Sequence, residues 1–375
     1  MKILFLINCL GGGGAERVLV NLVNHMDLHK HDITVQTIFS GDLNKRHLKD
    51  DIKVIESGWK SFKGISLLFK LIPARILYNL LVKNSDYDLM VAYMHGPPTK
   101  ILWGCPDKNV KKIAWLHTDM KRSSIGRTFF SKAQITRAFD SYDKIVGVSE
   151  TVSRSFRDLY GLGKKVTTKY NTHDIAKIKL LSGEATEDKW PGNKLLKIVS
   201  AGRFSEEKGY DRLLKVSRKL LEEGFRFNLL IMGSGSAKAS LQQYIENHGL
   251  GNNIRLSGFT ENPYPYIKKA DIFVCSSRTE GLSTVVSEAI ILGTPVVSTL
   301  VSGAYEVLGK NGEYGIIAEN SENGLYEGLK HLLSNPEKIE FYRKRAVERA
   351  GFFDTERSVK EVEKMFEEVL NCKDH

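Results

Sequence analysis

The chain has 375 residues, of which 42% are hydrophobic and 26% charged, and its formal net charge is +11. This composition excludes a disordered or fibrous protein, and the length predicts two domains of ordinary size. No apolar run reaches the ~18 residues that a membrane-spanning helix needs, so we predict no such helix.

Positive charge is concentrated in the first half of the chain. Residues 1–190 hold 30 Lys and Arg against 19 Asp and Glu, whereas residues 191–375 hold 25 of each. This asymmetry predicts two halves with different partners. The four cysteines (Cys9, Cys105, Cys275 and Cys372) are too scattered for a metal site and indicate reduced thiols in a cytoplasmic protein.

Strands and helices alternate along the first half, which predicts a parallel sheet with helices on both faces. The expected helices run from Ala15 to Met26 and from Ser149 to Tyr160. The expected strands are Lys2–Asn8, Asp32–Phe39, Asp88–Tyr93, Lys112–Leu116, Lys144–Ser149 and Val166–Asn171.

Four glycines, Gly11, Gly12, Gly13 and Gly14, separate the first strand from the first helix. Glycine lets the backbone approach a ligand closely, and the N–H groups at a helix N-terminus favour an anion. The loop therefore predicts contact with an anionic group. The alternative is a purely structural tight turn.

Two stretches of the first half combine basic and apolar residues. Residues 59–83 contain five Lys or Arg and no acid, and residues 121–137 place basic side chains around Phe129 and Phe130. Basic amphipathic segments bind anionic lipid, so we predict an anionic membrane surface as a partner. The alternative is a pair of core-packing helices with solvated basic faces. No nucleic-acid recognition module is visible, and we expect no nucleic-acid partner.

His117 follows the predicted strand that ends at Leu116. Ligands bind at the carboxyl ends of parallel strands, where an imidazole can hydrogen-bond a sugar or transfer a proton. A structural histidine with satisfied hydrogen bonds is the alternative. His95 lies at a similar strand end.

A polar, turn-rich segment at residues 183–193 is the expected linker between a first domain at 1–182 and a second at 194–350. Strand–helix alternation restarts after it, and a charged helical segment runs from Pro336 to Leu370. The expected strands are Leu196–Ala201, Phe227–Met232, Ile254–Ser257, Asp271–Ser276, Pro295–Ser298 and Tyr314–Ile317, and the expected helices are Gly209–Glu223, Ala237–His248, Tyr264–Lys269, Thr284–Leu292, Gly303–Leu308 and Asn323–Leu333.

Two cations follow the first strand of the second half. Arg203 and Lys208 lie on a loop before a helix, and together they predict a diphosphate clamp, because Arg offers a planar fork and Lys a point charge. The alternative is a solvated loop with ordinary surface charges. The next strand ends in Gly233-Ser234-Gly235, which lacks the third glycine of a dinucleotide fingerprint.

Two carboxylates mark the fourth strand–helix junction. Glu280 lies on the loop after the strand, and Glu288 lies about one turn into the following helix. Carboxylates placed in this way can bind two different hydroxyls of one sugar-containing ligand. The backbone N–H groups of Gly281, Leu282 and Ser283 lie at the helix N-terminus and favour an anion such as phosphate.

These motifs, in this order, resemble the retaining glycosyltransferases of family 4 over nearly the whole chain. The strongest mark is the pair Glu280 and Glu288 with seven residues between them. The resemblance implies an α/β protein of the GT-B fold, in which two Rossmann-like doubly wound domains face each other across a cleft. The first would bind the acceptor and the second the nucleotide-sugar, and residues 351–375 would form a helix crossing back to the first domain.

The resemblance also implies roles for residues of the second domain. Arg203 and Lys208 would hold the nucleotide diphosphate and stabilise its departure, and Glu288 would bind the ribose hydroxyls. Glu280 would contact hydroxyls of the donor sugar. The remaining residues expected at the nucleotide-sugar are Gly233, Gly235, Phe259, Thr260, Gly281, Leu282 and Ser283, with the backbone near Phe259 and Thr260 at the base.

In the first domain, the resemblance places His117 against the donor sugar and Gly12, Gly13 and Gly14 near the diphosphate and the acceptor. It implies transfer of a hexose or N-acetylhexosamine from a nucleotide-sugar, for which we expect a UDP-sugar, without cofactor or metal. Cations and helix N-termini would neutralise the leaving diphosphate. Retention would follow from front-face attack, with the departing phosphate oxygen taking the acceptor proton.

The resemblance within the family is to bacterial enzymes that extend lipid-linked surface glycans. The implied partners are a lipid-linked saccharide acceptor and the inner face of the cell membrane, with a cytoplasmic, peripheral location. The alternatives are a GT-B epimerase or hydrolase of sugar nucleotides, or a non-catalytic membrane- or nucleic-acid-binding module. A nicotinamide-dependent oxidoreductase is disfavoured because the dinucleotide fingerprint is incomplete.

Overall fold

The computed structural model describes residues 1–41, 43–60, 62, 64–82, 84, 86–187, 189–191 and 195–372. The chain divides into two compact units. Unit 1 consists of Met1–His173 and Thr355–His375, and unit 2 consists of Asp174–Asp354. None of the helices within the described ranges is long and apolar enough to cross a bilayer.

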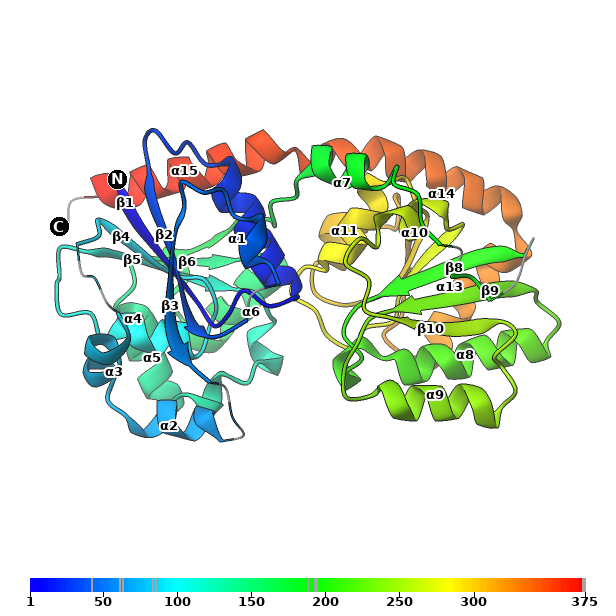
Figure 1. Cartoon of the computed structure of the whole chain (residues 1–375), viewed down its shortest axis with the longest axis horizontal. Coiled ribbons are helices and arrows are strands. Elements are labelled where there is room, and N and C mark those ends of the chain that lie inside the picture. Colours follow the sequence, from blue (N-terminus) through cyan, green and yellow to red (C-terminus); the bar gives the residue numbers. More distant parts are fainter. Residues whose placement is uncertain are drawn as a thin grey trace. The chain divides into compact units, whose positions relative to one another are not determined.

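Unit 1 is built around a seven-stranded sheet in the order β3-β2-β1-β4-β5-β6-β7, and every neighbouring pair is parallel. Helices cover both faces of this sheet (Figure 1), so residues Ile3 to Ile7 of the inner strand β1 are fully buried. The strands are β1 (Lys2–Ile7), β2 (Asp32–Phe39), β3 (Lys53–Trp59), β4 (Leu89–Ala92), β5 (Lys111–Leu116), β6 (Lys144–Gly147) and β7 (Val166–Thr168).

The helices of unit 1 follow the strands in sequence. They are α1 (Gly14–His25), α2 (Ile65–Leu71), α3 (Ala74–Leu81), α4 (Pro97–Trp103), α5 (Lys132–Asp140), α6 (Glu150–Tyr160) and α15 (Thr355–Asn371), with 3₁₀ turns at Lys45–His47, Met120–Arg122, Ile125–Arg127 and Gly163–Lys165.

Unit 2 repeats this plan with a six-stranded parallel sheet in the order β10-β9-β8-β11-β12-β13. The strands are β8 (Leu196–Ala201), β9 (Phe227–Met232), β10 (Ile254–Gly258), β11 (Ile272–Cys275), β12 (Val296–Thr299) and β13 (Ile316–Ala318). The helices are α7 (Ile175–Leu181), α8 (Tyr210–Glu222), α9 (Lys238–Asn247), α10 (Tyr264–Lys269), α11 (Thr284–Ile291), α12 (Ala304–Leu308), α13 (Glu322–Ser334) and α14 (Pro336–Arg349), with 3₁₀ turns at Glu206–Lys208 and Ala350–Phe353.

Every strand predicted from the sequence is present, and the predicted α/β class with parallel sheets is confirmed. β3 was not among the strands predicted from the sequence. This strand lies at the edge of its sheet, is only partly buried, and contains Gly58 beside an irregular register with β2, so its hydrophobic pattern is weak. The helices α4, which begins with two prolines, and α7 were not predicted either.

The division between the compact units differs from the predicted boundary at residue 182. The chain leaves unit 1 at His173, and α7 packs on α10 and α11 of unit 2. The predicted linker also lies against unit 2, because the Tyr266 hydroxyl donates to the carbonyl oxygen of Glu187 at 3.2 Å. Asp188, Gly192 and Asn193 of that linker lie outside the described residues.

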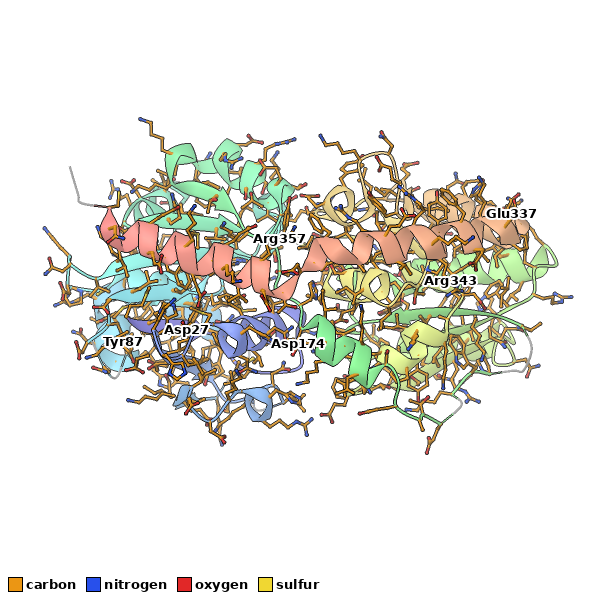
Figure 2. All side chains as sticks on the ribbon, turned by 90° about the horizontal axis from the view of Figure 1, so that it is seen from above. Asp27, Tyr87, Asp174, Glu337, Arg343 and Arg357 are labelled. Carbon is orange, nitrogen blue, oxygen red and sulfur yellow. The ribbon has the colours of Figure 1, made fainter. Side chains whose placement is uncertain are left out.

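The charged helical segment predicted from Pro336 to Leu370 consists of two helices, α14 and α15. α14, which carries Glu337 near its start and Arg343 near its middle (Figure 2), ends at Arg349, and a 3₁₀ turn containing Gly351 follows it. Glycine costs roughly 1 kcal/mol in a helix interior relative to alanine, which favours a break there.

The return of the last helix to the first unit is confirmed. α15 belongs to unit 1 and buries Val359, Val362, Met365, Phe366 and Val369 against it. Their spacing of three or four residues gives one apolar face. The Glu363 carboxylate of this helix accepts a hydrogen bond from the backbone N–H of Asp27 at 2.8 Å, and Asp27 lies beside α15 in Figure 2.

Candidate functional site

The predicted residues of the second half meet at one edge of the unit 2 sheet. Arg203 and Lys208 follow β8, Gly233 and Gly235 follow β9, Phe259 and Thr260 follow β10, and Glu280 follows β11. These four strands are adjacent in the sheet and parallel, so their carboxyl ends coincide. The structure therefore brings these residues together on neighbouring loops.

An ion pair between Lys208 and Glu280 lies at the centre of this edge. The Lys208 ammonium donates to the Glu280 carboxylate at 2.6 Å, and the Ser277 hydroxyl donates to the same oxygen at 2.7 Å. Burial on its own lowers the pKa of Lys208, but the Glu280 carboxylate outweighs this effect and raises that pKa above its ordinary value. Lys208 therefore stays cationic at neutral pH, and 25% of its side chain is exposed to meet an anion.

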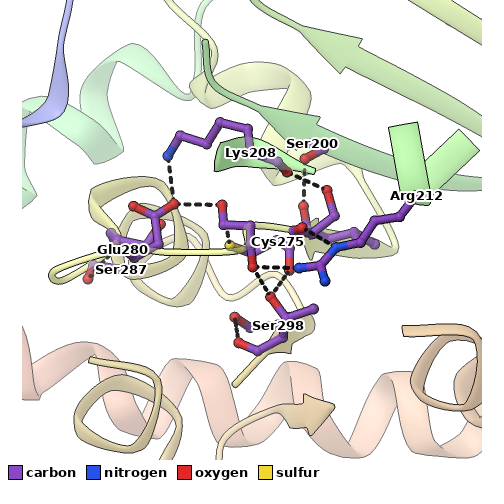
Figure 3. A network of polar contacts seen from close by, with 12 residues as sticks. Ser200, Lys208, Arg212, Cys275, Glu280, Ser287 and Ser298 are labelled. Atoms are coloured by element: carbon purple, nitrogen blue, oxygen red, sulfur yellow. Dashed lines mark hydrogen bonds and ion pairs between the residues drawn. The ribbon is translucent and has the colours of Figure 1, made fainter. Parts of the chain in front are cut away.

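Arg212 fixes the loop that carries Glu280. Its guanidinium, on α8, donates to the backbone carbonyls of Ser276 at 2.8 Å and Ser277 at 2.6 Å, and to the side-chain oxygen of Asn320 at 2.9 Å. Arg212 is 6% exposed, so these bonds are shielded from water. Figure 3 shows this guanidinium pointing into the network that contains Lys208 and Glu280.

A second set of contacts joins the Lys208 loop to the Glu280 loop. Arg278 forms a two-pronged ion pair with Asp211, with both nitrogen–oxygen distances at 2.7 Å, and it also donates to the carbonyl of Glu206 at 2.8 Å. The Ser276 hydroxyl donates to the carbonyl of Lys208 at 2.9 Å. The relative position of the two charged side chains is therefore set by contacts outside the ion pair itself.

Glu288 lies in α11 with its side chain 2% exposed. The Tyr264 hydroxyl donates to one of its carboxylate oxygens at 3.2 Å. The structure thus places Glu288 one turn into the helix, as predicted, but in a deeper position than Glu280. Tyr264 is a contact that the sequence analysis did not identify.

Two buried hydroxyls on the loops of unit 2 make no hydrogen bond within the described residues. They belong to Ser283, which precedes α11, and Thr260, which follows β10. An unpaired buried hydroxyl costs roughly 1–3 kcal/mol, so a ligand that supplied a partner would recover that free energy. Both residues were predicted at the nucleotide-sugar.

Gly233 and Gly235 have φ values of +155° and +153°. A Cβ at Gly233 would clash with the carbonyl oxygen of Gly202, and one at Gly235 with the backbone of Phe204. The backbone N–H of Phe204 donates to the carbonyl of Ser234 at 2.8 Å. These glycines therefore let the β9 loop pack directly on the β8 loop that carries Arg203.

Arg203 and Phe259 are exposed at this edge. The Arg203 guanidinium forms no ion pair within the described ranges, and Phe259 is 49% exposed. An exposed guanidinium beside the partly exposed Lys208 gives two cations of different geometry on one loop. This arrangement suits a ligand with two neighbouring anionic groups.

In unit 1, the glycine loop leads into α1 with Gly13 as the N-cap. The side chain of Glu16, which is 7% exposed, folds back over this residue, and a Cβ at Gly13 would clash with its carboxylate. A carboxylate at this position stabilises the partial positive charge of the helix N-terminus. The loop at Gly13 is therefore already covered on one side by an acid, which was not predicted from the sequence.

His117 follows β5 and packs against Tyr93, with ring centroids 4.9 Å apart. Its Nε2 atom is buried and unpaired within the described residues, as are Nδ1 of His95 and the hydroxyl of Tyr93. Burial, together with the neighbouring His95, lowers the pKa of His117 to about 3, and burial lowers that of His95 to about 4. Both imidazoles are neutral at physiological pH and can donate to or accept from a sugar hydroxyl.

No cluster of three or more His, Cys, Asp or Glu that could hold a metal ion occurs within the described ranges. Arg212, Asp211, Arg278 and Asn320 organise the unit 2 site but were not identified from the sequence. Arg278 lies two residues before Glu280, which was recognised. The other three residues lie outside the motifs recognised in the sequence.

Comparison with known proteins supports the fold and the family. The chain is 27% identical over 363 residues to a Campylobacter jejuni enzyme named N-acetylgalactosamine-N,N'-diacetylbacillosaminyl-diphospho-undecaprenol 4-alpha-N-acetylgalactosaminyltransferase, covering 94% of this chain and 96% of that protein. It is 26% identical over 329 residues to the lipopolysaccharide core biosynthesis glycosyltransferase LpsE of Rhizobium meliloti, covering 86% of each.

The crystal structure of Anabaena HepE in complex with UDP superposes with a TM-score of 0.74 at 18% identity, covering 98% of this chain and 100% of that one. This likeness establishes the GT-B fold. Residues 12–177 match the family described as Glycosyltransferase Family 4, and residues 184–349 match the family described as Glycosyl transferases group 1. The chain therefore belongs to the group 1 glycosyltransferases of family 4, a family of retaining enzymes.

Proposed function

We propose that this protein transfers a hexose or N-acetylhexosamine from a UDP-sugar to a lipid-linked saccharide, with retention of configuration and without a metal ion. The observation that carries the proposal is the Lys208–Glu280 ion pair beside Arg203 at the carboxyl ends of β8 and β11. The acceptor would lie at the inner face of the cell membrane, with the protein bound peripherally from the cytoplasm.

Lys208 and Arg203 would bind the diphosphate of the donor. The two cations stabilise the negative charge that develops on the diphosphate as the bond to the sugar breaks. Lys208 is suited to this role because it is fixed by one carboxylate and still partly exposed. The Glu280 carboxylate would accept hydrogen bonds from hydroxyls of the donor sugar, and it would also orient Lys208.

Glu288 and the N-terminus of α11 would bind the rest of the donor. The buried Glu288 carboxylate would accept hydrogen bonds from the ribose hydroxyls, and the Ser283 and Thr260 hydroxyls would gain partners. His117 in unit 1 would contact the sugar as a neutral imidazole. The departing phosphate oxygen would take the proton of the acceptor hydroxyl during front-face attack.

The substrate classes are supported by the relatives. The Campylobacter enzyme is named for transfer to a diphospho-undecaprenol-linked saccharide, LpsE for lipopolysaccharide core synthesis, and HepE was solved with UDP. The first of these names supports a lipid-linked saccharide as acceptor, and the last supports a UDP-linked donor.

The test combines a donor panel with matched variants. The protein is mixed with UDP-glucose, UDP-galactose, UDP-N-acetylglucosamine or UDP-N-acetylgalactosamine, and thermal stabilisation is measured. UDP release is then followed with undecaprenyl-diphosphate-linked saccharides. We expect one donor to stabilise the protein, and Lys208→Met and Glu288→Gln to reduce transfer about 10²-fold or more.

Lys215→Met is the matched control, because Lys215 lies on α8 and pairs with Glu322 at the surface. Transfer at the wild-type rate in both Lys208→Met and Glu288→Gln would contradict the proposed roles. UDP release that is independent of any acceptor would instead indicate a hydrolase or epimerase. Stabilisation by none of the donors would argue against a UDP-sugar.

A further inference from the structure

Exposed apolar side chains gather on one part of unit 1. They lie on α2 and just before it, on α3, and in the segment after the 3₁₀ turn Ile125–Arg127. The most exposed are Phe62 at 59%, Leu67 at 57%, Leu71 at 60%, Ile76 at 49%, Leu80 at 59% and Phe130 at 58%. Single exposed apolar side chains are ordinary, but a group on adjacent segments indicates an interaction surface.

The same segments are basic and contain no acid. No Asp or Glu occurs in residues 57–85 or in residues 120–139, and each range contains five Lys or Arg. Lys60, Arg75, Arg127 and Lys132 are exposed, whereas Lys63 and Lys83 lie outside the described residues. The surface therefore combines protruding apolar groups with positive charge.

Direct contacts join the two segments. The Lys70 ammonium, on α2, donates to the carbonyl of Gly126 at 3.4 Å and lies 5.5 Å from the centre of the Phe130 ring. These residues are more than fifty positions apart in the sequence. The two basic stretches predicted separately from the sequence are thus parts of one surface.

Lys100 is the buried link between these parts. Its side chain is 1% exposed, and its ammonium donates to the carbonyls of Phe69 at 2.6 Å and Lys70 at 2.8 Å near the end of α2, and to that of Thr128 at 3.5 Å. No carboxylate within the described residues pairs with it. A buried cation held by carbonyls from two segments fixes one segment against the other.

The surface lies at the carboxyl ends of the unit 1 strands. Phe69 of α2 packs against Phe39, the last residue of β2, and Trp59, the last residue of β3, with ring centroids 6.0 Å apart in each case. Open α/β sheets bind ligands at this end. A molecule docked on the surface would therefore lie beside the end of the sheet where the acceptor is expected.

We propose that α2, α3 and the segment around Phe130 form one surface that docks on an anionic lipid membrane, and that Lys100 positions its two parts. The chemistry fits this occupant, because protruding apolar side chains enter the acyl boundary while Lys and Arg meet anionic headgroups. A second copy of the chain is disfavoured, since a two-fold contact would oppose basic surfaces of like sign. The inference rests on the proposed function only in that a lipid-linked acceptor lies at a membrane.

The first experiment measures flotation of the full chain with vesicles of phosphatidylcholine alone or mixed with phosphatidylglycerol, without any sugar substrate. We expect binding to the anionic vesicles only, weakening as salt is added. Replacing Lys60, Arg75 and Arg127 together with Gln should reduce binding about 10²-fold, at about fivefold per charge. Leu67→Ser with Leu71→Ser should also reduce it.

The matched control replaces three exposed basic residues of unit 2, Arg226, Lys238 and Lys268, with Gln. Equal binding to both vesicle types, or equal loss in the control, would overturn the proposal. The protein could instead fail to bind vesicles and form dimers at high concentration. If Leu67→Ser abolished those dimers, the surface would be assigned to a second copy of the chain. Because no donor or acceptor is present, this result is independent of the proposed transfer reaction.

The second experiment tests Lys100 as a positioning residue. Lys100→Met should retain the circular dichroism of the folded protein but lose at least tenfold in binding to anionic vesicles, although the surface residues are unchanged. Lys112→Met removes another partly buried lysine of unit 1 and controls for general destabilisation. Wild-type vesicle binding by folded Lys100→Met would refute the positioning role.

Discussion

Replacing Arg212 with Met should disable the unit 2 site, although Arg212 itself is not expected to contact the donor or the acceptor. The side chain is 6% exposed and donates three hydrogen bonds, to the carbonyls of Ser276 and Ser277 and to the side chain of Asn320. Met fills much of the same space but donates nothing. The loop between β11 and Glu280 would lose the contacts that hold it to α8.

The magnitude follows from the number and kind of these bonds. A hydrogen bond from a charged donor contributes about 1.5–3 kcal/mol, so three such bonds sum to more than about 4 kcal/mol. Removing the guanidinium also removes the cost of burying a cation, which offsets part of that loss. We therefore expect the free energy of unfolding to fall by about 2–4 kcal/mol.

The effect on transfer should be larger than the effect on stability implies. Ser277 donates directly to Glu280, and Glu280 pairs with Lys208, so a shift of the loop moves both charges. A displacement of about 1 Å in a reacting site can cost about 10²-fold in rate. We expect kcat to fall by that order while the protein remains folded at room temperature.

The assay compares Arg212→Met, Arg212→Lys and Arg218→Met by thermal unfolding and by UDP release with donor and acceptor. Arg218 lies on the same helix and pairs with Glu222 at the surface, so its replacement should change neither property. Lys cannot span two carbonyls as the guanidinium does, so Arg212→Lys should restore little. A clear loss of stability with unchanged kcat would refute the positioning argument.

Three further predictions concern other parts of the two units. Gly233→Ala should lower the free energy of unfolding by more than about 2 kcal/mol, because its Cβ would clash with the carbonyl of Gly202 in a positive-φ region; urea unfolding beside Gly251→Ala, where the added Cβ meets open space, tests this. The pKa values of His95 and His117, about 4 and about 3, lie below the ordinary 6.5, so the unfolded state binds more protons and stability falls as the pH drops below about 6.5. Each contributes about 2 kcal/mol of that loss at about pH 5, and His117→Gln should reduce the difference in urea midpoint between pH 7 and pH 5 by its share. Chelation with EDTA should leave the transfer rate within about twofold of the untreated enzyme, since Lys208 and Arg203 are expected to neutralise the diphosphate; a large loss restored by Mg²⁺ would contradict metal independence.

The charged residues at the strand ends were predictable because the rule that places them is simple. Parallel strands end at one edge, so residues that follow β8, β9, β10 and β11 must be neighbours whatever their separation in the sequence. Lys208 and Glu280 are 72 positions apart and still form an ion pair. The hydrophobic runs of these strands were strong enough to be recognised without the structure.

The elements that were missed or divided differently lack such a pattern. The edge strand β3 is only partly buried, and the break between α14 and α15 depends on a short turn containing Gly351. The helix α7 lies with unit 2 although it precedes the predicted linker. Its assignment depends on packing against α10 and α11, which no local feature of residues 175–181 indicates.

Arg212 and Lys100 escaped the sequence analysis for a common physical reason. Each is a buried cation on a helix. Its side chain donates mainly to backbone carbonyls of another segment. Every residue has the same backbone carbonyl, whatever its side chain. The positions that accept these hydrogen bonds therefore need no particular residue type, and a sequence motif cannot identify them. A buried Arg or Lys with no carboxylate partner is costly unless such carbonyls converge on it.

In this chain Arg212 holds the Glu280 loop and Lys100 holds the basic surface of unit 1. The proposed donor chemistry depends on the first of these segments and membrane docking on the second. Substituting either cation should therefore impair function while every residue expected to touch donor, acceptor or lipid remains in place.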